Sequence, residues 1–291
     1  MEAYFHEKGV NYLNDSWIIE NLNNALVTWN NKLAEIWSLV SQSPEEFKGG
    51  AIWGVVVDIH SALQGVAYGL LILFFALSVF RHTVNFQELR RPEAAFRFFI
   101  RFVLTKTIIT YSMDCMTAIF SVCSGIVETI ASGMGDITQA NAALPDEIQT
   151  AIKEVSFLES IPLWLVSFLG SLFILILSFV LILTVYGRFF KLFLYTAFAP
   201  IPLSTFAGEV TSHTGKAFLK SYIGVCLEGG VIVLACMIYS AFLSSGNPGL
   251  PNTESAVAMI WSYMGETIFN MLVLTALVKG ADRVIKEMMA L

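Results

Sequence analysis

Long runs of apolar residues, separated by short polar stretches, dominate the chain. They predict five membrane-spanning helices, at about 58–80, 98–128, 161–187, 218–243 and 256–279. Each is long enough to cross a hydrocarbon core of about 30 Å as a helix. The clearest is the run 160–187, which holds 28 residues without a charge. The last two predicted spans each carry one carboxylate near the middle, Glu228 and Glu266.

A sixth apolar stretch, 189–208, is interrupted by Pro200 and Pro202. Each proline removes a backbone donor and clashes with the preceding helical turn. A straight crossing is therefore disfavoured, since irregular backbone at membrane depth is tolerated only against protein or a water-filled cavity. We expect a broken segment that is either re-entrant or interfacial.

The distribution of basic residues favours the five-span arrangement. If 189–208 does not cross, 12 of the 17 Lys and Arg residues fall on one side and 4 on the other. If it crosses, the split is 7 against 9 and the bias disappears. Because short cytoplasmic loops are enriched in Lys and Arg, we expect the N-terminus outside and the C-terminus inside the cell (cytoplasmic) membrane.

The first 50 residues predict an extracytoplasmic amphipathic region, and 51–291 a helical membrane domain. Apolar residues recur in the N-terminal region at three- and four-residue spacing, which is typical of a helix with one apolar face: Ile18, Leu22, Leu26, Trp29, Leu33, Ile36, Trp37 and Val40. This helix either docks onto the membrane domain or binds a partner. The sequence from Ser43 to Glu46 resembles a capping box, which predicts that the helix leading into the first span begins there.

An acidic outer loop is expected at about 132–160, between the second and third spans. It carries five carboxylates against one lysine. Pro145, followed by Asp146 and Glu147, predicts a short helix within this loop, because proline is well placed at a helix start.

Composition defines the class of protein. Apolar residues make up 56% of the chain and charged residues 14%, against about 25% in ordinary soluble domains. The mean hydropathy is +0.67 and the net charge −6. These values exclude a soluble enzyme, a disordered chain and a basic nucleic-acid binder. We therefore expect an all-α polytopic membrane protein.

Polar residues within the second predicted span fall on one face of a helix. At 100° per residue they occupy an arc of about 80°, and they form the polar stripe: Lys106, Thr110, Asp114, Thr117, Ser121, Ser124 and Glu128. Because charge within a span is costly, the stripe either lines a water-filled path or a subunit interface, or is neutralised within one subunit. Lys106 paired with Glu228 or Glu266 would be one such neutralisation.

Two further features concern helix packing. Glu228 and Glu266 share their faces with small and polar residues, which suggests that both faces meet other helices. Gly65 and Gly69 form a small-residue pair that permits close helix approach, either within the chain or between copies.

No catalytic or metal-binding motif is found. The chain lacks a phosphate-binding loop, a His-Glu-x-x-His sequence and a Gly-x-Ser-x-Gly elbow. The four cysteines lie in apolar stretches without metal-ligand spacing. We expect no enzymatic activity, no metal and no cofactor.

Several strings resemble a known family. They are the run from Thr184 to Lys191, which continues into Ala199-Pro200-Ile201-Pro202-Leu203; the run Phe206–Glu209; Ser221-Tyr222 followed by Val225–Gly229; and the basic run Glu88–Pro92. Together, over roughly 51–285, they resemble the TrbL-like polytopic membrane subunit of type IV secretion machines, in the form carried by conjugative elements of Gram-positive bacteria. Members of that family are described with about five spans and the orientation that the charge count favours.

The resemblance implies a structural role in conjugation. Several copies, a homo-oligomer, would assemble with cytoplasmic ATPases and other secretion subunits among membrane lipids, and would pass relaxase-bound single-stranded DNA. Lys106, Asp114 and Glu128 would form the polar path or interface, and Glu228 and Glu266 would pair across helices. Pro200 and Pro202 would hold the broken segment. The basic residues Arg90, Arg91 and Arg188 would face the cytoplasm, near ATPases or lipid phosphates, or would serve topology alone.

An alternative function is secondary transport. In that case Glu228, Glu266 and Asp114 would form a coupling-ion site, because intramembrane carboxylates often mark ion pathways.

Overall fold

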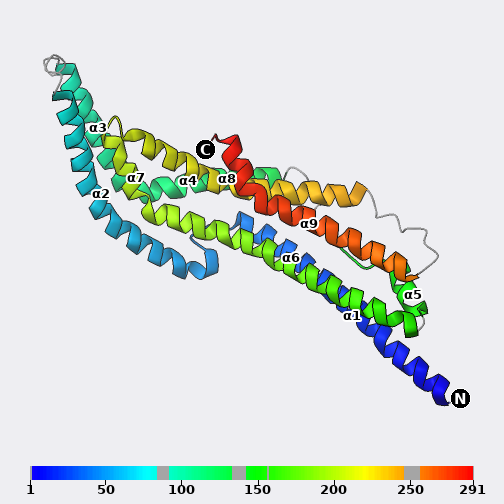
Figure 1. The fold of residues 1–291 in the computed structure, drawn as a ribbon. Helices are drawn as coiled ribbons and strands as arrows, with labels where there is room; N and C mark the ends of the chain where they lie inside the picture. Colours follow the sequence, from blue (N-terminus) through cyan, green and yellow to red (C-terminus); the bar gives the residue numbers. More distant parts are fainter. Residues whose placement is uncertain (1, 84–91, 133–141, 156, 246–255, 291) are drawn as a thin grey trace. The chain divides into compact units, whose positions relative to one another are not determined.

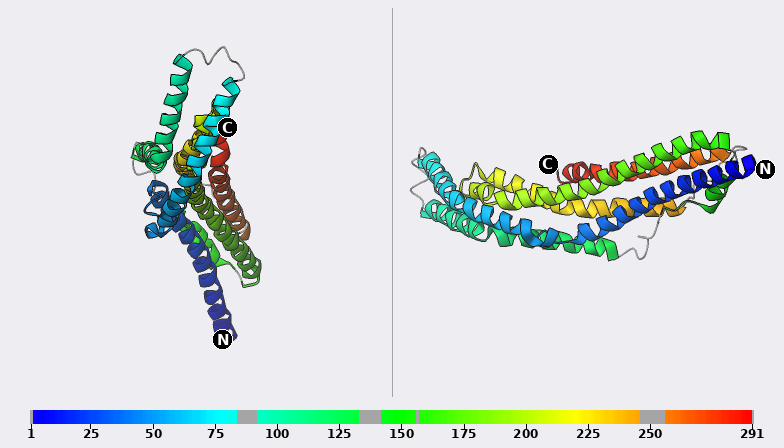
Figure 2. Two further views of the ribbon diagram at one scale, coloured as in Figure 1. Left: turned by 90° about the vertical axis from the view of Figure 1, so that its left-hand side faces the viewer. Right: turned by 90° about the horizontal axis from the view of Figure 1, so that it is seen from below.

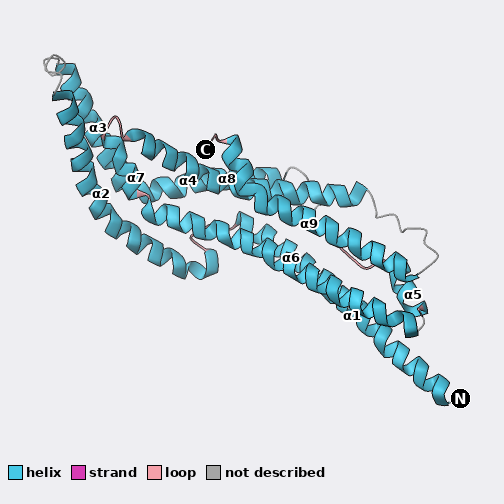
Figure 3. Cartoon of the chain, in the orientation of Figure 1, coloured by secondary structure: helices cyan, strands magenta, loops and turns pink. Residues whose placement is uncertain are grey.

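In the computed structural model, the described part of the chain is built almost entirely from helices (Figures 1 and 3). The structure describes all residues except 1, 84–91, 133–141, 156, 246–255 and 291. Within that part there is no strand, and the helices are, in chain order, α1 Glu2–Ser41, η1 Phe47–Gly50, α2 Ala51–Thr83, α3 Pro92–Thr110, α4 Ser112–Ser132, α5 Asp146–Glu154, α6 Phe157–Phe198, α7 Pro200–Ser204, η3 Thr205–Ala207, α8 Ser212–Ser245 and α9 Ala256–Met288. The predicted all-α fold class is confirmed.

Four segments of the described chain are long and apolar enough to cross a membrane. They are Phe47–Arg81, Ser112–Ser132, Ile161–Phe198 and Ser212–Phe242. The predicted span 256–279 lies within α9, which is helical over 33 residues. It is not among the four, so its crossing stays a prediction.

The helices pack as two compact units. The first comprises Met1–Val40, Ala131–Val185 and Ile232–Gly280, and the second Ser41–Ile130, Tyr186–Val231 and Ala281–Leu291. Packing therefore groups the chain differently from the predicted boundary at residue 50, because α6, α8 and α9 each contribute to both units.

In the first unit, the predicted apolar face of α1 is buried. Ile18, Leu22, Leu26 and Trp29 are each at most 3% exposed. Polar contacts join α1 to α6: the Asn21 amide donates to the Ser171 hydroxyl at 2.8 Å. The Trp17 and Trp164 rings also stack at 5.4 Å. Of the two roles considered for this helix, these contacts favour docking within the chain.

The end of the outer loop is held by side chains from two helices of the first unit. The side-chain amide of Asn30 on α1 donates to the Ala142 carbonyl at 2.9 Å, and its oxygen accepts from the Ala142 N–H at 3.1 Å. The Tyr263 hydroxyl on α9 donates to the carbonyl of Ala143 at 3.1 Å. The predicted short helix follows as α5, directly after Pro145.

The start of the first span differs from the prediction. The Ser43–Glu46 segment forms a turn, in which the Glu46 N–H donates to the Ser43 carbonyl at 3.1 Å. Lys48 and the two following glycines then adopt left-handed conformations, with φ between 52° and 78°. An α-helix cannot run through such residues, so α2 begins only at Ala51. The turn buries Phe47, whose ring stacks on that of Phe189 at 4.2 Å.

The second predicted span is not one helix. The segment 98–128 divides into α3 and α4, which meet at Tyr111, and α4 leaves the direction of α3 there (Figure 2). Only α4 is among the four apolar segments. α3 carries four charged residues, Glu93, Arg97, Arg101 and Lys106, and charge lowers the hydropathy of a helix.

The predicted broken segment begins later than expected. α6 continues as a helix to Phe198, so 189–198 extends the third span instead of belonging to the break. The break itself lies at Pro200, the first residue of the five-residue helix α7, and is followed by η3 and a turn into α8. It packs against α2 and α3 within the second unit.

The burial of α1 yields a stability prediction. Trp29 is 1% exposed, whereas Trp261 in the same unit is 61% exposed. We expect Trp29→Ala to lower the free energy of unfolding by about 3–5 kcal/mol, because it opens a cavity. Trp261→Ala removes the same atoms from an exposed position and should change the free energy of unfolding by about 0.5 kcal/mol or less. Unfolding of both variants in one detergent tests this, and equal losses would contradict the docking of α1.

Candidate functional site: two internal polar networks

The first network is a ladder of polar side chains on α2. His60, Gln64 and Tyr68 follow one another at four-residue spacing, which places them on one helix face. All three reach backbone or hydroxyl groups where neighbouring helices break.

His60 contacts the break between α6 and α7. Its Nδ1 lies 2.7 Å from the carbonyl oxygen of Thr196. That carbonyl would normally accept from the N–H of the residue four positions later, but this residue is Pro200, which has none. The Ala199 N–H reaches it only at 3.4 Å. His60 thus satisfies the carbonyl that the proline leaves without its helical donor.

The same ladder reaches the break between α3 and α4. The Gln64 amide donates to the carbonyls of Ile109 and Thr110 at 2.7 and 3.0 Å. The Tyr68 hydroxyl lies 2.9 Å from the hydroxyl of Thr110, and His60 Nε2 lies 2.7 Å from that of Ser112. One face of α2 therefore serves both helix breaks.

Hydroxyl groups complete the backbone pairing around the prolines. Ser204 donates to the Ile201 carbonyl and Thr205 to the Pro202 carbonyl, each at 2.6 Å. Thr211 donates to the carbonyl of Thr205 at 2.8 Å. An unpaired backbone group in an apolar surrounding is costly. These hydroxyl contacts therefore stabilise the broken segment around Pro200 and Pro202.

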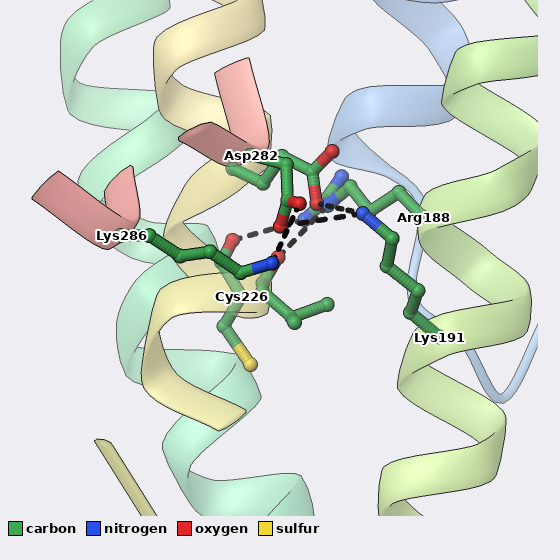
Figure 4. Close-up of polar contacts among 7 residues, drawn as sticks. Arg188, Lys191, Cys226, Asp282 and Lys286 are labelled. Carbon is green, nitrogen blue, oxygen red and sulfur yellow. Dashed lines mark hydrogen bonds and ion pairs between the residues drawn. The ribbon is translucent and has the colours of Figure 1, made fainter. Parts of the chain in front are cut away.

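The second network is a cluster of charges from α6, α8 and α9, drawn in Figure 4. Lys191 on α6 lies 3.4 Å from Glu228 on α8 and 3.4 Å from Asp282 on α9. Lys286 lies 2.9 Å from the other oxygen of Asp282. Glu228 is 2% exposed, so Lys191 compensates a buried carboxylate and joins three helices.

Asp282 lies near the C-terminal end of α9, beyond the predicted span. Its partial burial opposes ionisation, but the hydrogen bond from Lys286 and the charge of Lys191 outweigh it and lower the pKa of the carboxyl. A lowered pKa stabilises the folded protein above the ordinary aspartate value, and this contribution is lost as the pH falls through the lowered value.

Arg188 occupies the interior of this cluster and is 1% exposed. Its guanidinium donates to the Cys226 carbonyl at 3.1 Å and to the Val225 carbonyl at 3.4 Å. It also lies in the field of Glu228. Arg188 therefore lies inside the second unit with its charge compensated there, and its position on the cytoplasmic side stays a prediction.

The absence of a side chain at Gly229 allows the Arg188 guanidinium to lie here. A Cβ built on Gly229 would lie 2.6 Å from the Arg188 guanidinium carbon. The planar group thus rests against the α8 backbone at a place where a side chain would exclude it. The string around Arg188 and the string ending at Gly229 meet here, although they are 41 positions apart.

Glu228 has a partner other than the expected Glu266. The partner of Glu228 is Lys191, and Glu266 is an exposed residue of the first unit. Two carboxylates repel unless they share a proton, and a lysine on the adjacent helix is the better partner. The same contact replaces the suggested pairing of Lys106 with Glu228.

The break at Tyr111 divides the polar stripe, with Lys106 and Thr110 on α3 and the other members on α4. Lys106, Thr110, Asp114, Ser121 and Glu128 are exposed, and Thr117 and Ser124 are half-buried. In the described part of the chain none of its three charges forms an ion pair. Thr110 forms hydrogen bonds with α2, through Tyr68 and Gln64.

Gly65 and Gly69 are exposed as well. A Cβ built on either glycine meets no atom within 4 Å. They do not serve close packing within the chain, which leaves packing between copies as the alternative. Arg90 and Arg91 lie outside the described residues.

No group of three His, Cys, Asp or Glu side chains in the described ranges is arranged to hold a metal ion. The ladder on α2 and the charges of Asp282 and Lys286 were not singled out from the sequence, and Lys191 and Gly229 were named only as members of the strings that resemble the family. A visible signal existed for the ladder, namely three polar residues at four-residue spacing in an apolar span.

These features define a multi-pass helical membrane protein whose interior charges and broken helices are compensated by its own side chains. The family model for TrbL/VirB6 plasmid conjugal transfer-like proteins matches residues 29–200. The match covers more than half of the 291 residues, and the chain belongs to this family. It includes Arg188, Lys191 and Pro200, whereas Glu228 and Gly229 lie beyond it.

No curated protein and no solved structure matches the chain. Family membership makes it a subunit of a type IV secretion or conjugative transfer system, which associates with other subunits of that system.

The contact between Gly229 and Arg188 yields a second prediction. Gly229→Ala should lower stability: the gain in helix propensity is about 0.5–1 kcal/mol, whereas displacing a buried charged donor costs roughly 1–3 kcal/mol or more. Gly230→Ala is the matched control, since its Cβ would lie 3.6 Å from Val127 and 3.8 Å from Ile130, in ordinary contact. Thermal unfolding in one detergent compares them. A Gly229→Ala protein as stable as Gly230→Ala would contradict the close approach.

Proposed function

We propose that the chain is a structural subunit of the translocation channel of a conjugation machine and helps to pass relaxase-bound single-stranded DNA across the cytoplasmic membrane. Family membership supports the machine, and the family is one of structural channel subunits rather than enzymes. The observation that carries the channel role is the exposed polar stripe on α3 and α4.

The stripe contrasts with the charges inside the protein. Glu228 and Arg188 are buried and have partners from neighbouring helices. Lys106 is exposed on α3, which also carries Arg97 and Arg101, and Asp114 and Glu128 are exposed near the two ends of α4, which has no other charge. A charge facing lipid is costly, up to roughly 2.5–3.5 kcal/mol at the centre of a span on insertion scales. We infer that these side chains face water or a neighbouring subunit.

Both surroundings are compatible with a channel assembled from several copies. The open face at Gly65 and Gly69 supports close packing between copies. The stripe carries one basic and two acidic side chains, so it does not hold DNA by counterion release. Such a surface suits a conduit, with the energy supplied by cytoplasmic ATPases of the same machine.

For orientation we infer an outside N-terminus and an inside C-terminus. The support is the bias of 12 basic residues to one side. In this orientation the turn between η3 and α8 lies in the cytoplasm, near the ATPase partners, and α5 lies outside.

Secondary transport has less support. It needs carboxylates that are available to a coupling ion, but Glu228 is engaged by Lys191. Asp114 is exposed on α4 and belongs to the same unit as Glu228, and the structure places no contact between them among the described residues.

The stripe can be tested by neutralising it. Lys106→Gln and Asp114→Asn should each reduce conjugative DNA transfer by about tenfold or more, equivalent to roughly 1.4 kcal/mol of barrier. Neither change should lower the amount of protein in the membrane, because neither side chain is buried. Glu147→Gln, on the exposed face of α5, is the control for loss of a charge outside the stripe. Unchanged transfer in both stripe variants would contradict the channel role.

The orientation can be tested by labelling in a background from which the four cysteines are removed. Thr150→Cys on α5 should react with a membrane-impermeant thiol reagent on intact cells, whereas Thr214→Cys should react only after permeabilisation. Both positions are exposed, so burial does not explain a difference. Labelling of Thr214→Cys on intact cells would overturn the five-span orientation.

A further inference from the structure

His60 is a buried imidazole between two hydrogen-bond partners of different kinds. Its side chain is 3% exposed. Nδ1 faces the Thr196 carbonyl and Nε2 faces the Ser112 hydroxyl, each at 2.7 Å. A carbonyl oxygen only accepts, so Nδ1 must carry a proton. A hydroxyl both donates and accepts, so Ser112 leaves the state of Nε2 open.

Ser112 has a second acceptor within reach. Its hydroxyl lies 2.7 Å from the carbonyl of Ile109. When the hydroxyl donates to Nε2, His60 is neutral, and the Ile109 carbonyl still accepts from the Gln64 amide at 2.7 Å. When the hydroxyl donates to the Ile109 carbonyl, Nε2 must donate to the Ser112 oxygen, and His60 is an imidazolium. Both arrangements use the same heavy-atom positions.

The two protonation states therefore differ only by one proton on Nε2 and a rotation of the Ser112 hydroxyl. A ring nitrogen that accepts from a fixed N–H donor loses that hydrogen bond when it gains a proton, because two donors then face each other. At His60 that loss is avoided, since the Ser112 hydroxyl can turn to the Ile109 carbonyl.

Titratable side chains on the surrounding elements do not supply a counter-charge. Asp58 lies two positions before His60 on α2, and Asp114 lies two positions after Ser112 on α4. Both aspartates are exposed. Tyr68 bonds to Thr110 and Tyr111 is exposed. Cys115 on α4 is half-buried, and Tyr195 on α6 packs its ring against Phe218 and Tyr222. The Tyr222 hydroxyl on α8 donates to the Met116 carbonyl at 3.0 Å. Neither ring nitrogen has a carboxylate partner in the described part of the chain, so the neutral ring is expected at neutral pH.

We propose that His60 is a proton-binding site at the junction of α2, α4 and the proline break of α6, with Ser112 as the group that adapts to the bound proton. The proton enters at Nε2, while Nδ1 remains bonded to the carbonyl that Pro200 leaves without its helical donor. Proton binding thus takes place on the same ring that holds the broken helix.

The test is NMR of the full-length protein in detergent micelles with ¹⁵N-labelled histidine, titrated from about pH 8 to about pH 5, either side of the ordinary histidine value of about 6.5. At the alkaline end His60 should be the neutral tautomer with the proton on Nδ1. On acidification Nε2 should gain a proton in a folded protein, with the Nδ1 proton still protected from exchange. His60→Gln assigns the resonances by removing them.

Ser112→Ala separates the proposed role from simple burial. It should shift the Nε2 resonance and leave the Nδ1 resonance in place, because only Nε2 contacts the hydroxyl. If His60→Gln does not fold, a protein with His6, His82 and His213 replaced by Gln keeps His60 as its only histidine. A neutral tautomer with the proton on Nε2, or a ring that stays neutral until the protein unfolds, would overturn the proposal.

Discussion

Backbone groups within a membrane have no water to bond with, and this constraint governs the second unit of the structure. Pro200 cannot donate to Thr196, and the helix α6 therefore ends with an acceptor that needs a partner from elsewhere. His60 provides it at 2.7 Å. The hydroxyls of Ser204 and Thr205 provide the local equivalents. The position of α2 against the break follows from this requirement as much as from apolar packing.

A second constraint is the placement of charge. Arg188 lies in the interior of the second unit, where a guanidinium needs acceptors over much of its edge. Two carbonyls of α8 supply them, and the absence of a side chain at Gly229 lets the group approach. Lys191, one helical turn further along α6, compensates Glu228 on α8 and Asp282 on α9. A short stretch of α6 thus organises three helices, which gives a structural reason for the resemblance carried by the strings around Arg188 and Gly229.

The sequence predicts burial where the spacing of apolar residues within one helix determines which face is buried. The apolar face of α1 and the start of α5 at Asp146 followed from spacing and from proline at a helix start. The exact breaks did not follow. No proline or glycine marks the break at Tyr111. The division of 98–128 depends on Gln64 and Ser112, whose side chains donate to the Ile109 carbonyl that the break leaves free. The partner of Glu228 depended on which helix lies beside α8, and spacing within one helix does not contain that information.

The division between compensated and uncompensated charge separates structure from function in this chain. Arg188, Glu228 and Asp282 hold helices together, and each has its partners within the second unit. Lys106, Asp114 and Glu128 contribute nothing comparable to the fold of one subunit, because they are exposed and form no ion pair in the part of the chain that the structure describes. Charges that face lipid cost free energy and need a compensating neighbour. Under the proposed channel role, that neighbour is either a second subunit or the water through which a polar substrate passes.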